Sequence, residues 1–193
     1  MGRGQETIEC NTTDAPTHSL RWGRYFITKY CPEKQSIKVI TKNKSNMNKQ
    51  ESSELLDKAA KICIENHYGQ RDKMNCAYFQ HPMRVAMRCE TDDEKMVALL
   101  HDTIEDTEVT IDYLLDEGFP KYITDAILAV TRQPNESYEE FIKRAKKNGI
   151  GRMVKIHDLE DNLDTTRLNE VSPEMAVRFS KYLKALRYLK AED

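Results

Sequence analysis

The sequence predicts an all-α fold for most of the chain, and three observations lead to this prediction. From about residue 50 onward, apolar residues recur at the spacings of three and four that are typical of helices. Helix-capping signals precede several of these segments, including Thr91 with Glu94 and Ser137 with Glu140. The β-branched and aromatic runs that favour strands lie before residue 42.

Length and composition indicate one domain. With 193 residues the chain can bury a core but cannot form two large domains. Its net charge of -2 argues against a dominant role on DNA, RNA or a membrane surface. No apolar run is long enough to span a membrane, and no signal-peptide core follows Met1. The five cysteines, an odd number without paired spacing, are expected to be buried thiols in a cytoplasmic protein.

The chain is expected to divide near residue 50. Residues 1–20 are polar and lack periodicity, which is typical of a mobile tail. Residues 24–30 and 36–41 resemble two strands joined by a turn. Residues 1–50 are therefore expected to form a small appendage, either a β-hairpin or a disordered segment. Residues 51–193 are expected to form the helical domain.

Local signals place the individual helices. A first helix over residues 53–67 is expected to start at a Ser53 cap and to stop near Gly69. The helix that Thr91 opens is expected to continue through His101 to Asp106. Shorter helices are expected after a Thr110 cap and over residues 122–130, and another after Ser137. The last helix follows Pro173, and its apolar stripe is expected to be core: Met175, Phe179, Tyr182, Leu186 and Leu189.

The strongest chemical signal is the segment LHDTIEDT at residues 100–107. At helical pitch, residues four apart share a face, so His101 is expected to stack over Glu105 and Asp102 over Asp106. An imidazole beside a carboxylate can begin a divalent metal site, and the second acidic pair can steer a bound water. The segment therefore predicts metal-dependent chemistry, provided that the rest of the chain supplies further ligands.

Further ligands come from a short list, because the chain has five histidines. His81 opens a helix with Pro82 in its first turn, and Asp158 shares a helix face with Asn162. Each of these also has a purely structural interpretation, as a helix-terminal histidine or a solvated acidic face. His67 is expected to cap the first helix, and His157 is expected to orient Asp158 or to have no role.

The order of the motifs resembles the HD phosphohydrolase superfamily. The segment YFQHP at residues 78–82 is similar to the PYxxHP motif of that family. LHDTIEDT is similar to the LHDxxEDT of the RelA/SpoT-type hydrolases of alarmone nucleotides, and DLEDN from Asp158 resembles their D-x-x-x-N. The likeness covers roughly residues 53–190 and implies that the helical bundle is an HD domain.

The resemblance also implies roles for individual residues. Glu105 and Asp106 would hold and activate the attacking water, and Asn162 and Thr165 would contact the nucleotide. In the resembling enzymes the metal is manganese, and the reaction removes pyrophosphate from the 3′ position of guanosine tetra- or pentaphosphate. A set of two imidazoles and two carboxylates suits manganese, iron or zinc better than calcium. The implied metal ligands are His81, His101, Asp102 and Asp158.

The motifs indicate the substrate less directly than they indicate the metal ligands. The residues expected to contact a phosphorylated nucleotide also include Arg71, Lys73, Tyr78, Arg84 and Lys155. Many alarmone hydrolases have an arginine-lysine pair where this chain has Asp72-Lys73, and a carboxylate cannot stack on a purine as a guanidinium does.

The leading hypothesis from the sequence is thus a (p)ppGpp-like alarmone hydrolase, acting as a monomer or an oligomer. One alternative is a hydrolase of (p)ppApp or other nucleoside phosphates. The other is a non-catalytic nucleotide-binding or antitoxin-like module. The intact pair of Glu105 and Asp106 favours an enzyme, because binding alone needs no water-steering carboxylates.

Overall fold

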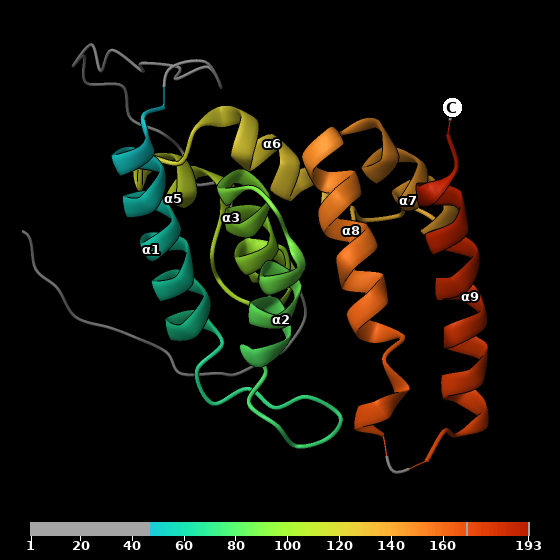
Figure 1. Cartoon of the computed structure of the whole chain (residues 1–193). Helices are drawn as coiled ribbons and strands as arrows, with labels where there is room; N and C mark the ends of the chain where they lie inside the picture. Colours follow the sequence, from blue (N-terminus) through green and yellow to red (C-terminus); the bar gives the residue numbers. More distant parts are fainter. Residues whose placement is uncertain (1–46, 169, 193) are drawn as a thin grey trace, which may run out of the picture. The chain divides into compact units, whose positions relative to one another are not determined.

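The computed structural model describes residues 47–168 and 170–192, all within one of the two units of the chain, Val39–Asp193. These described residues form helices joined by turns and loops and contain no strand, which confirms the predicted all-α class (Figure 1). The hairpin expected over residues 24–41 lies outside the described residues. The helices are α1 Lys49–Asn66, α2 Gln80–Arg88, α3 Asp92–Leu100, α4 Thr103–Asp106, α5 Ile111–Asp116, α6 Lys121–Val130, α7 Tyr138–Lys147, α8 Gly149–Asn162, the 3-10 helix η2 Thr165–Arg167 and α9 Pro173–Lys190.

A first hydrophobic core surrounds α3. All five residues from Met96 to Leu100 are buried, so the second half of this helix is apolar on every side. Helix α1 covers it with the predicted stripe, of which Ala59, Ile62 and Cys63 are fully buried. Helices α2, α5 and α6 complete this core. The two residues that follow Leu100 are therefore held by a rigid, central helix.

Helix α8 connects this core to a second one. Val154 belongs to the first core, whereas Ile156 and Leu159 pack with α7 and α9 in the second. Helix α8 contacts α2, α3, α6, α7 and α9 (Figure 1). Gly151 permits its close approach to α6, because a Cβ atom there would lie 3.1 Å from Cβ of Ala129. A polar side chain on the buried face of α8 is thus enclosed by several elements.

Helix α1 begins earlier than the sequence analysis predicted. Its N-cap is Asn48, and Ser53 lies exposed in the second turn. The Asn48 side chain accepts a hydrogen bond from the Glu51 backbone N–H at 2.9 Å, and the Glu51 carboxylate accepts one from the Asn48 backbone N–H at 3.2 Å. This reciprocal pair is a capping box, which satisfies two backbone donors where a lone serine satisfies one.

The other predicted helix starts are confirmed. Thr91 and Ser137 each form the expected capping box, and Thr110 caps α5. Ser172 caps α9, with Pro173 as its first residue. These starts depend on residues only two or three positions apart.

The predicted continuous helix through His101 is wrong. Helix α3 ends at Leu100, and a separate short helix α4 begins at Thr103. The His101 ring Nδ1 bonds the Ala98 carbonyl at 2.7 Å, and the Thr103 hydroxyl donates to the Leu100 carbonyl at 2.6 Å. Side chains therefore occupy carbonyls at the end of α3, which favours a break. The Asp106 backbone N–H still bonds the Asp102 carbonyl at 3.0 Å.

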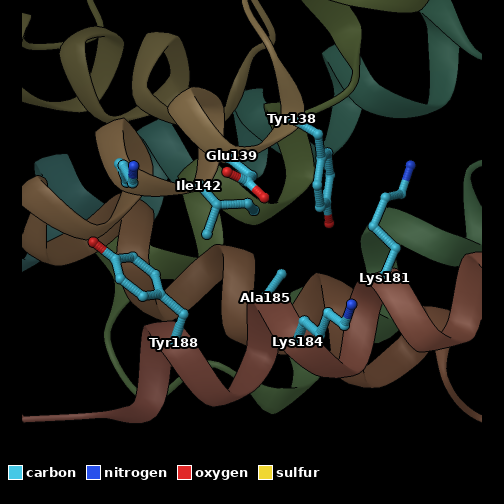
Figure 2. A pocket seen from close by; sticks show the side chains of 8 residues that line it. Tyr138, Glu139, Ile142, Lys181, Lys184, Ala185 and Tyr188 are labelled. Atoms are coloured by element: carbon cyan, nitrogen blue, oxygen red, sulfur yellow. The ribbon is translucent and has the colours of Figure 1, made fainter.

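The apolar stripe of α9 is core only in part. Leu189 is fully buried, and Tyr182 and Leu186 pack against the second core. Met175 and Tyr182 also line a cavity that is described below. A separate groove of about 270 Å³ lies between α7 and α9, with Ile142 and Ala185 among its lining residues (Figure 2).

The expected burial of the cysteines is confirmed for two of the three that the structure describes. Cys63 and Cys89 are buried thiols, whereas Cys76 is a free thiol on the surface.

Among the described helices, none combines the length and the apolar character that crossing a bilayer requires.

Candidate metal centre and catalytic cavity

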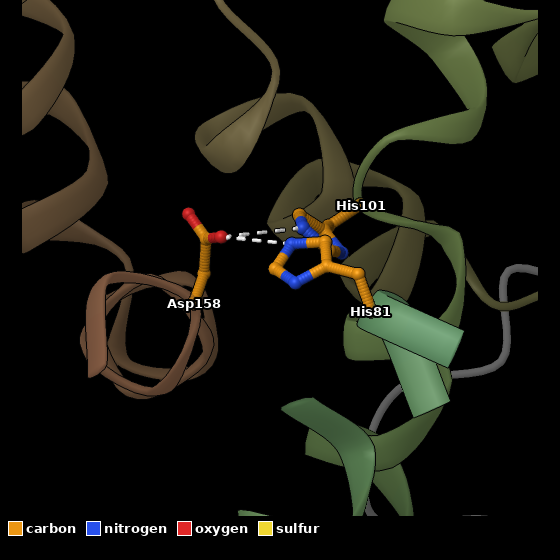
Figure 3. Close-up of side chains that lie close together, drawn as sticks. All are labelled: His81, His101 and Asp158. Carbon is orange, nitrogen blue, oxygen red and sulfur yellow. Dashed lines mark ion pairs between the residues drawn. The ribbon is translucent and has the colours of Figure 1, made fainter. Parts of the chain in front are cut away.

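Three parts of the fold bring the four predicted metal ligands together. His81 lies in the first turn of α2, and Asp158 lies on the buried face of α8. His101 and Asp102 form the break between α3 and α4. Figure 3 shows both imidazole rings turned toward the Asp158 carboxylate, although His81 and Asp158 are far apart in the sequence.

The donor atoms of His81, His101 and Asp158 lie within 4.8 Å of one another, and a carboxylate oxygen of Asp102 lies next to both histidines. Nε2 of His81 lies 3.1 Å from Oδ1 of Asp158 and 3.7 Å from Oδ2 of Asp102. Nε2 of His101 lies 3.2 Å from the same Asp102 oxygen and 3.7 Å from the same Asp158 oxygen. Two nitrogens and two oxygens therefore alternate around a small centre, and we call these four residues the cage.

The histidines of the cage are oriented to bind a cation. In each ring Nδ1 is already bonded: that of His101 to the Ala98 carbonyl and that of His81 to an Asp161 oxygen, both at 2.7 Å. An imidazole that donates from Nδ1 presents a lone pair on Nε2. Nε2 of His101 is buried and has no hydrogen-bond partner among the described residues. A buried, unpartnered lone pair of this kind is what a metal ion would satisfy.

The charges in the cage also favour a cation. Although burial opposes protonation of His81, hydrogen bonds to Asp158 and Asp161 outweigh it and raise its pKa to about 10. Burial likewise opposes a charged Asp158, yet Lys155 and both histidines hold its pKa well below the ordinary value. The carboxylates thus stay ionised and attract positive charge to the centre: a proton on His81 in the metal-free chain, which a bound metal cation would replace.

The Lys155 side chain stabilises the cage from one side. Its Nζ donates to Oδ2 of Asp158 at 2.7 Å and lies 4.8 Å from the centroid of the Phe141 ring. Burial opposes the charge of Lys155, but Asp158 more than compensates and raises its pKa. Because Lys155 occupies one oxygen of Asp158, the other oxygen faces the histidines.

Glu105 and Asp106, the predicted water-activating pair, lie beside the cage on α4. Both side chains are exposed at the cavity, yet desolvation by the surrounding protein is the main cause that raises the pKa of each carboxyl, and the charge of Asp102 adds to it. The Arg132 backbone N–H donates to Glu105 and partly offsets the effect there. This direction is the one expected of neighbouring carboxyls, because like charges that lie close together make each group hold its proton more tightly.

A cavity of about 470 Å³ opens onto this arrangement. His81, Asp102 and Asp158 line it together with Glu105 and Asp106. His101, the fourth residue of the cage, is buried and is not among the residues that line the cavity. A volume of this size lies within the usual range for a small-molecule site, so a nucleotide-sized ligand can reach both the cage and the carboxyl pair.

Six of the seven predicted substrate contacts line the same cavity. Arg71 and Lys73 are exposed residues of the loop before α2. Tyr78 donates its hydroxyl to Asp102 at 2.6 Å. The amide of Asn162 donates to Asp158 at 2.6 Å. The six are Arg71, Lys73, Tyr78, Arg84, Lys155 and Asn162.

Thr165 is the exception. Helix α8 ends at Asn162, and Asp164 caps the separate helix η2 that Thr165 opens. Asp158 and Asn162 share a face of α8 as expected, whereas Thr165 does not continue that face. Thr165 is exposed and is not among the residues that line the cavity, so its nucleotide contact stays a prediction.

Two predicted roles for other histidines can be compared with the structure. His67 is the C-cap of α1, as expected, and its buried ring bonds Gln70 at 2.8 Å. The His157 ring pairs with Glu160 at 3.1 Å, whereas Lys155 and Asn162 donate hydrogen bonds to the Asp158 carboxylate, so the expected orienting role of His157 is not supported.

Sequence reasoning missed several residues around the site. Asp161 is fully buried and contacts His81, Arg84 and Arg167. Its spacing of three from Asp158 on one helix is a signal that could have indicated it. The apolar part of the cavity wall had no such signal, because its members come from separate loops and helices: Met74, Leu168, Met175 and Tyr182.

Fold and cage together agree with the resemblance noted in the sequence, because a helical domain presents two histidines and two aspartates beside a carboxyl pair. A scan against protein-family models found no matching model. The chain is 28% identical over 125 residues to the guanosine-3′,5′-bis(diphosphate) 3′-pyrophosphohydrolase of Aquifex aeolicus (strain VF5), covering 58% of this chain. The chain spans only 18% of that relative's length.

A solved structure gives the same indication for the fold. A metazoan orthologue of SpoT that hydrolyses ppGpp superposes with a TM-score of 0.60 and 21% sequence identity. The match covers 71% of this chain and 86% of that one. This chain therefore has the fold of that solved structure, and the two matches support the resemblance that its motifs indicate.

Proposed function

We propose that this chain is a metal-dependent phosphohydrolase that removes the 3′-pyrophosphate from (p)ppGpp-like alarmone nucleotides. The observation that carries the proposal is the convergence of His81, His101, Asp102 and Asp158 beside Glu105 and Asp106, next to a cavity that all of these residues except His101 line. The relative named above is a guanosine-3′,5′-bis(diphosphate) 3′-pyrophosphohydrolase, and the similar solved structure is of a protein that hydrolyses ppGpp. Both similarities support the same reaction for this chain.

The proposal assigns the cage to one divalent cation, and manganese fits the donor set. Two imidazole nitrogens and two carboxylate oxygens suit manganese, iron or zinc, because calcium prefers oxygen ligands alone. When bound, such a cation polarises a phosphoryl oxygen and lowers the pKa of a nearby water.

The protein's own groups move the protons. One carboxyl of the pair Glu105 and Asp106 orients a water and takes its proton as the water attacks the 3′-bound phosphorus. The bond between that phosphorus and the 3′ oxygen breaks, and the other carboxyl, still protonated, delivers a proton to the leaving oxygen. The raised pKa of both groups supports these paired roles.

Cations around the cavity offset the phosphate charge of the substrate. Arg71 and Lys73 lie at the cavity and form no ion pair with another described residue, so each can meet a phosphate. Tyr78 and Asn162 position the carboxylates of the cage through their hydrogen bonds and also face the ligand space.

The proposal extends to the setting of the protein. It takes residues 51–193 as the HD domain and residues 1–50 as an appendage. The ligand is a phosphorylated nucleotide, with neither nucleic acid nor a membrane as partner, and the location is cytoplasmic.

The test is turnover of a nucleotide panel by the full chain. ppGpp, ppApp and ordinary deoxynucleoside triphosphates are incubated with manganese, with and without a chelator, and the products are separated by HPLC. We expect ppGpp to yield GDP and pyrophosphate, and chelation to stop the reaction. Faster turnover of ppApp or of deoxynucleoside triphosphates would replace the substrate, and tight binding without turnover of any member would overturn the enzyme proposal.

A further inference from the structure

We propose that Asp161 is a positioning residue that sets the geometry of the cage. It fixes the His81 ring and joins its own helix α8 to α2 and to η2. Nothing in the motif resemblance assigns a role to this residue. The inference rests on the cage of the proposed function and adds a fifth side chain that would not touch the metal.

The contact with His81 is the first step of the argument. Oδ2 of Asp161 lies 2.7 Å from Nδ1 of His81, while Nε2 of the same ring lies 3.1 Å from Oδ1 of Asp158. The imidazole is thus held between two carboxylates that stand three residues apart on α8. A carboxylate that accepts from Nδ1 keeps the proton there, turns Nε2 toward the cage and increases its basicity.

The second step is the set of arginines around Asp161. Arg84 of α2 forms a two-pronged contact, with Nε 2.9 Å from Oδ1 and Nη2 3.0 Å from Oδ2. Arg167 of η2 donates to Oδ2 at 3.3 Å and to the Asp161 backbone carbonyl at 2.8 Å. A fully buried carboxylate is costly unless it is paired and hydrogen-bonded, and these contacts satisfy it.

The third step is where these partners come from. Helix α2 carries His81, helix α8 carries Asp158, and η2 leads to the apolar wall at Leu168. Asp161 therefore links two ligand-bearing helices and a wall of the cavity through one side chain. Arg84, which the sequence indicated as a phosphate contact, has two of its nitrogens committed to this link.

The experiment compares Asp161→Asn with Glu160→Gln in the full chain. Both changes remove one negative charge at neighbouring positions of α8, but Glu160 bonds His157 and Lys190, away from the cage. Manganese affinity is measured by calorimetric titration of the metal-free protein. We expect Asp161→Asn to lower the affinity about 10- to 100-fold, as is usual when the partner of a ligating histidine is lost. Glu160→Gln should keep the wild-type affinity.

A spectroscopic measurement separates positioning from general structural damage. In the zinc-loaded chain, nitrogen-15 NMR of the histidines should show His81 and His101 both protonated on Nδ1. Asp161→Asn should shift the His81 resonances and leave those of His101, whose Nδ1 bonds the Ala98 carbonyl. Equal shifts of both residues, or wild-type affinity in Asp161→Asn, would overturn the inference.

Three further outcomes are also decisive. If Asp161→Asn does not fold, the wild-type spectrum decides, because a His81 protonated on Nε2 in the zinc-loaded chain contradicts the inference. If the wild-type chain binds neither manganese nor zinc, the proposed function fails together with its cage. If it binds metal but Asp161→Asn binds equally well, only this inference fails.

Discussion

At the scale of single residues, Glu105 and Asp106 are adjacent but have different surroundings. Glu105 accepts a hydrogen bond from the Arg132 backbone, which fixes one of its oxygens, and no described backbone group holds Asp106 in this way. Both carboxyls have a pKa raised mainly by desolvation. Catalysis by this pair depends on proton transfer, whereas metal binding depends on the cage.

Removing either acid should therefore separate binding from chemistry. We expect Glu105→Gln and Asp106→Asn each to lower kcat for ppGpp by about 100- to 10,000-fold, the usual contribution of a positioned acid or base. Manganese affinity should change little. Single-turnover HPLC measures the rate, and Glu108→Gln, an exposed acid two residues further on, is the matched control. Undiminished rates in both variants would show that the pair does not move protons.

Cys63 gives a pH dependence of stability. Burial in the first core is the main cause that raises its pKa from 9.0 to about 12. Above pH 9 the unfolded chain loses the thiol proton while the folded chain keeps it, so stability falls as pH rises. We expect the metal-free wild type to lose up to about 1.4 kcal/mol per pH unit more than Cys63→Ala between pH 9 and 11. Urea unfolding at each pH measures this difference.

The exposed Cys76 supplies the control for that measurement. Cys76→Ala should follow the wild-type curve, since its thiol meets the same solvent in both states. Parallel curves for the wild type and Cys63→Ala would contradict the assignment of a buried, protonated Cys63.

The four cage residues could be predicted because they stand in three ordered motifs. The role of Asp161 could not, because the partner of the His81 Nδ1 is decided by how α2 packs on α8, over a separation of 80 residues. The commitment of Arg84 to Asp161 was hidden for the same reason. Sequence spacing indicates which residues can share a face of one helix, but it does not indicate which residues of a neighbouring helix that face will contact.

At the scale of elements, helix starts were predictable where the capping residues are local. Thr91 and Ser137 illustrate this, since each bonds a residue three positions away. The start of α1 was misplaced because Asn48 and Ser53 are both reasonable caps, and only the Glu51 partner distinguishes them. The break between α3 and α4 was missed, because side-chain bonds to carbonyls compete with the helix without changing its apolar pattern.

The cap of α1 can be tested directly. Asn48→Ala should lower the free energy of unfolding by about 1 kcal/mol, because it leaves a backbone donor of the first turn unsatisfied. Ser53→Ala, at the position that the sequence favoured, should be neutral or slightly stabilising within a helix. Thermal and urea unfolding measure both. A larger loss for Ser53→Ala than for Asn48→Ala would contradict the observed start.

At the scale of the whole molecule, α8 joins the two cores and carries Asp158 between them. Leu159, 1% exposed, anchors α8 to the second core beside this ligand. Leu159→Ala should lower the free energy of unfolding by about 2–5 kcal/mol, as a buried leucine truncation does. Because α8 then loses its anchor next to Asp158, manganese affinity should also fall.

Leu114 provides the comparison, since it is fully buried in α5, which carries none of the cage residues. Leu114→Ala should cost a similar stability but keep the manganese affinity at a temperature where it is folded. Urea unfolding and calorimetric titration of both variants test this. Equal effects on affinity would show that α8 has no special part in holding the cage.

The most direct test of the central claim is a titration of the metal-free full chain with manganese. The account expects one ion per chain at neutral pH, no binding at this site in His101→Gln, and wild-type binding in His157→Gln, a histidine outside the cage. A chain that binds no manganese, or that binds it equally well without His101, would contradict the account.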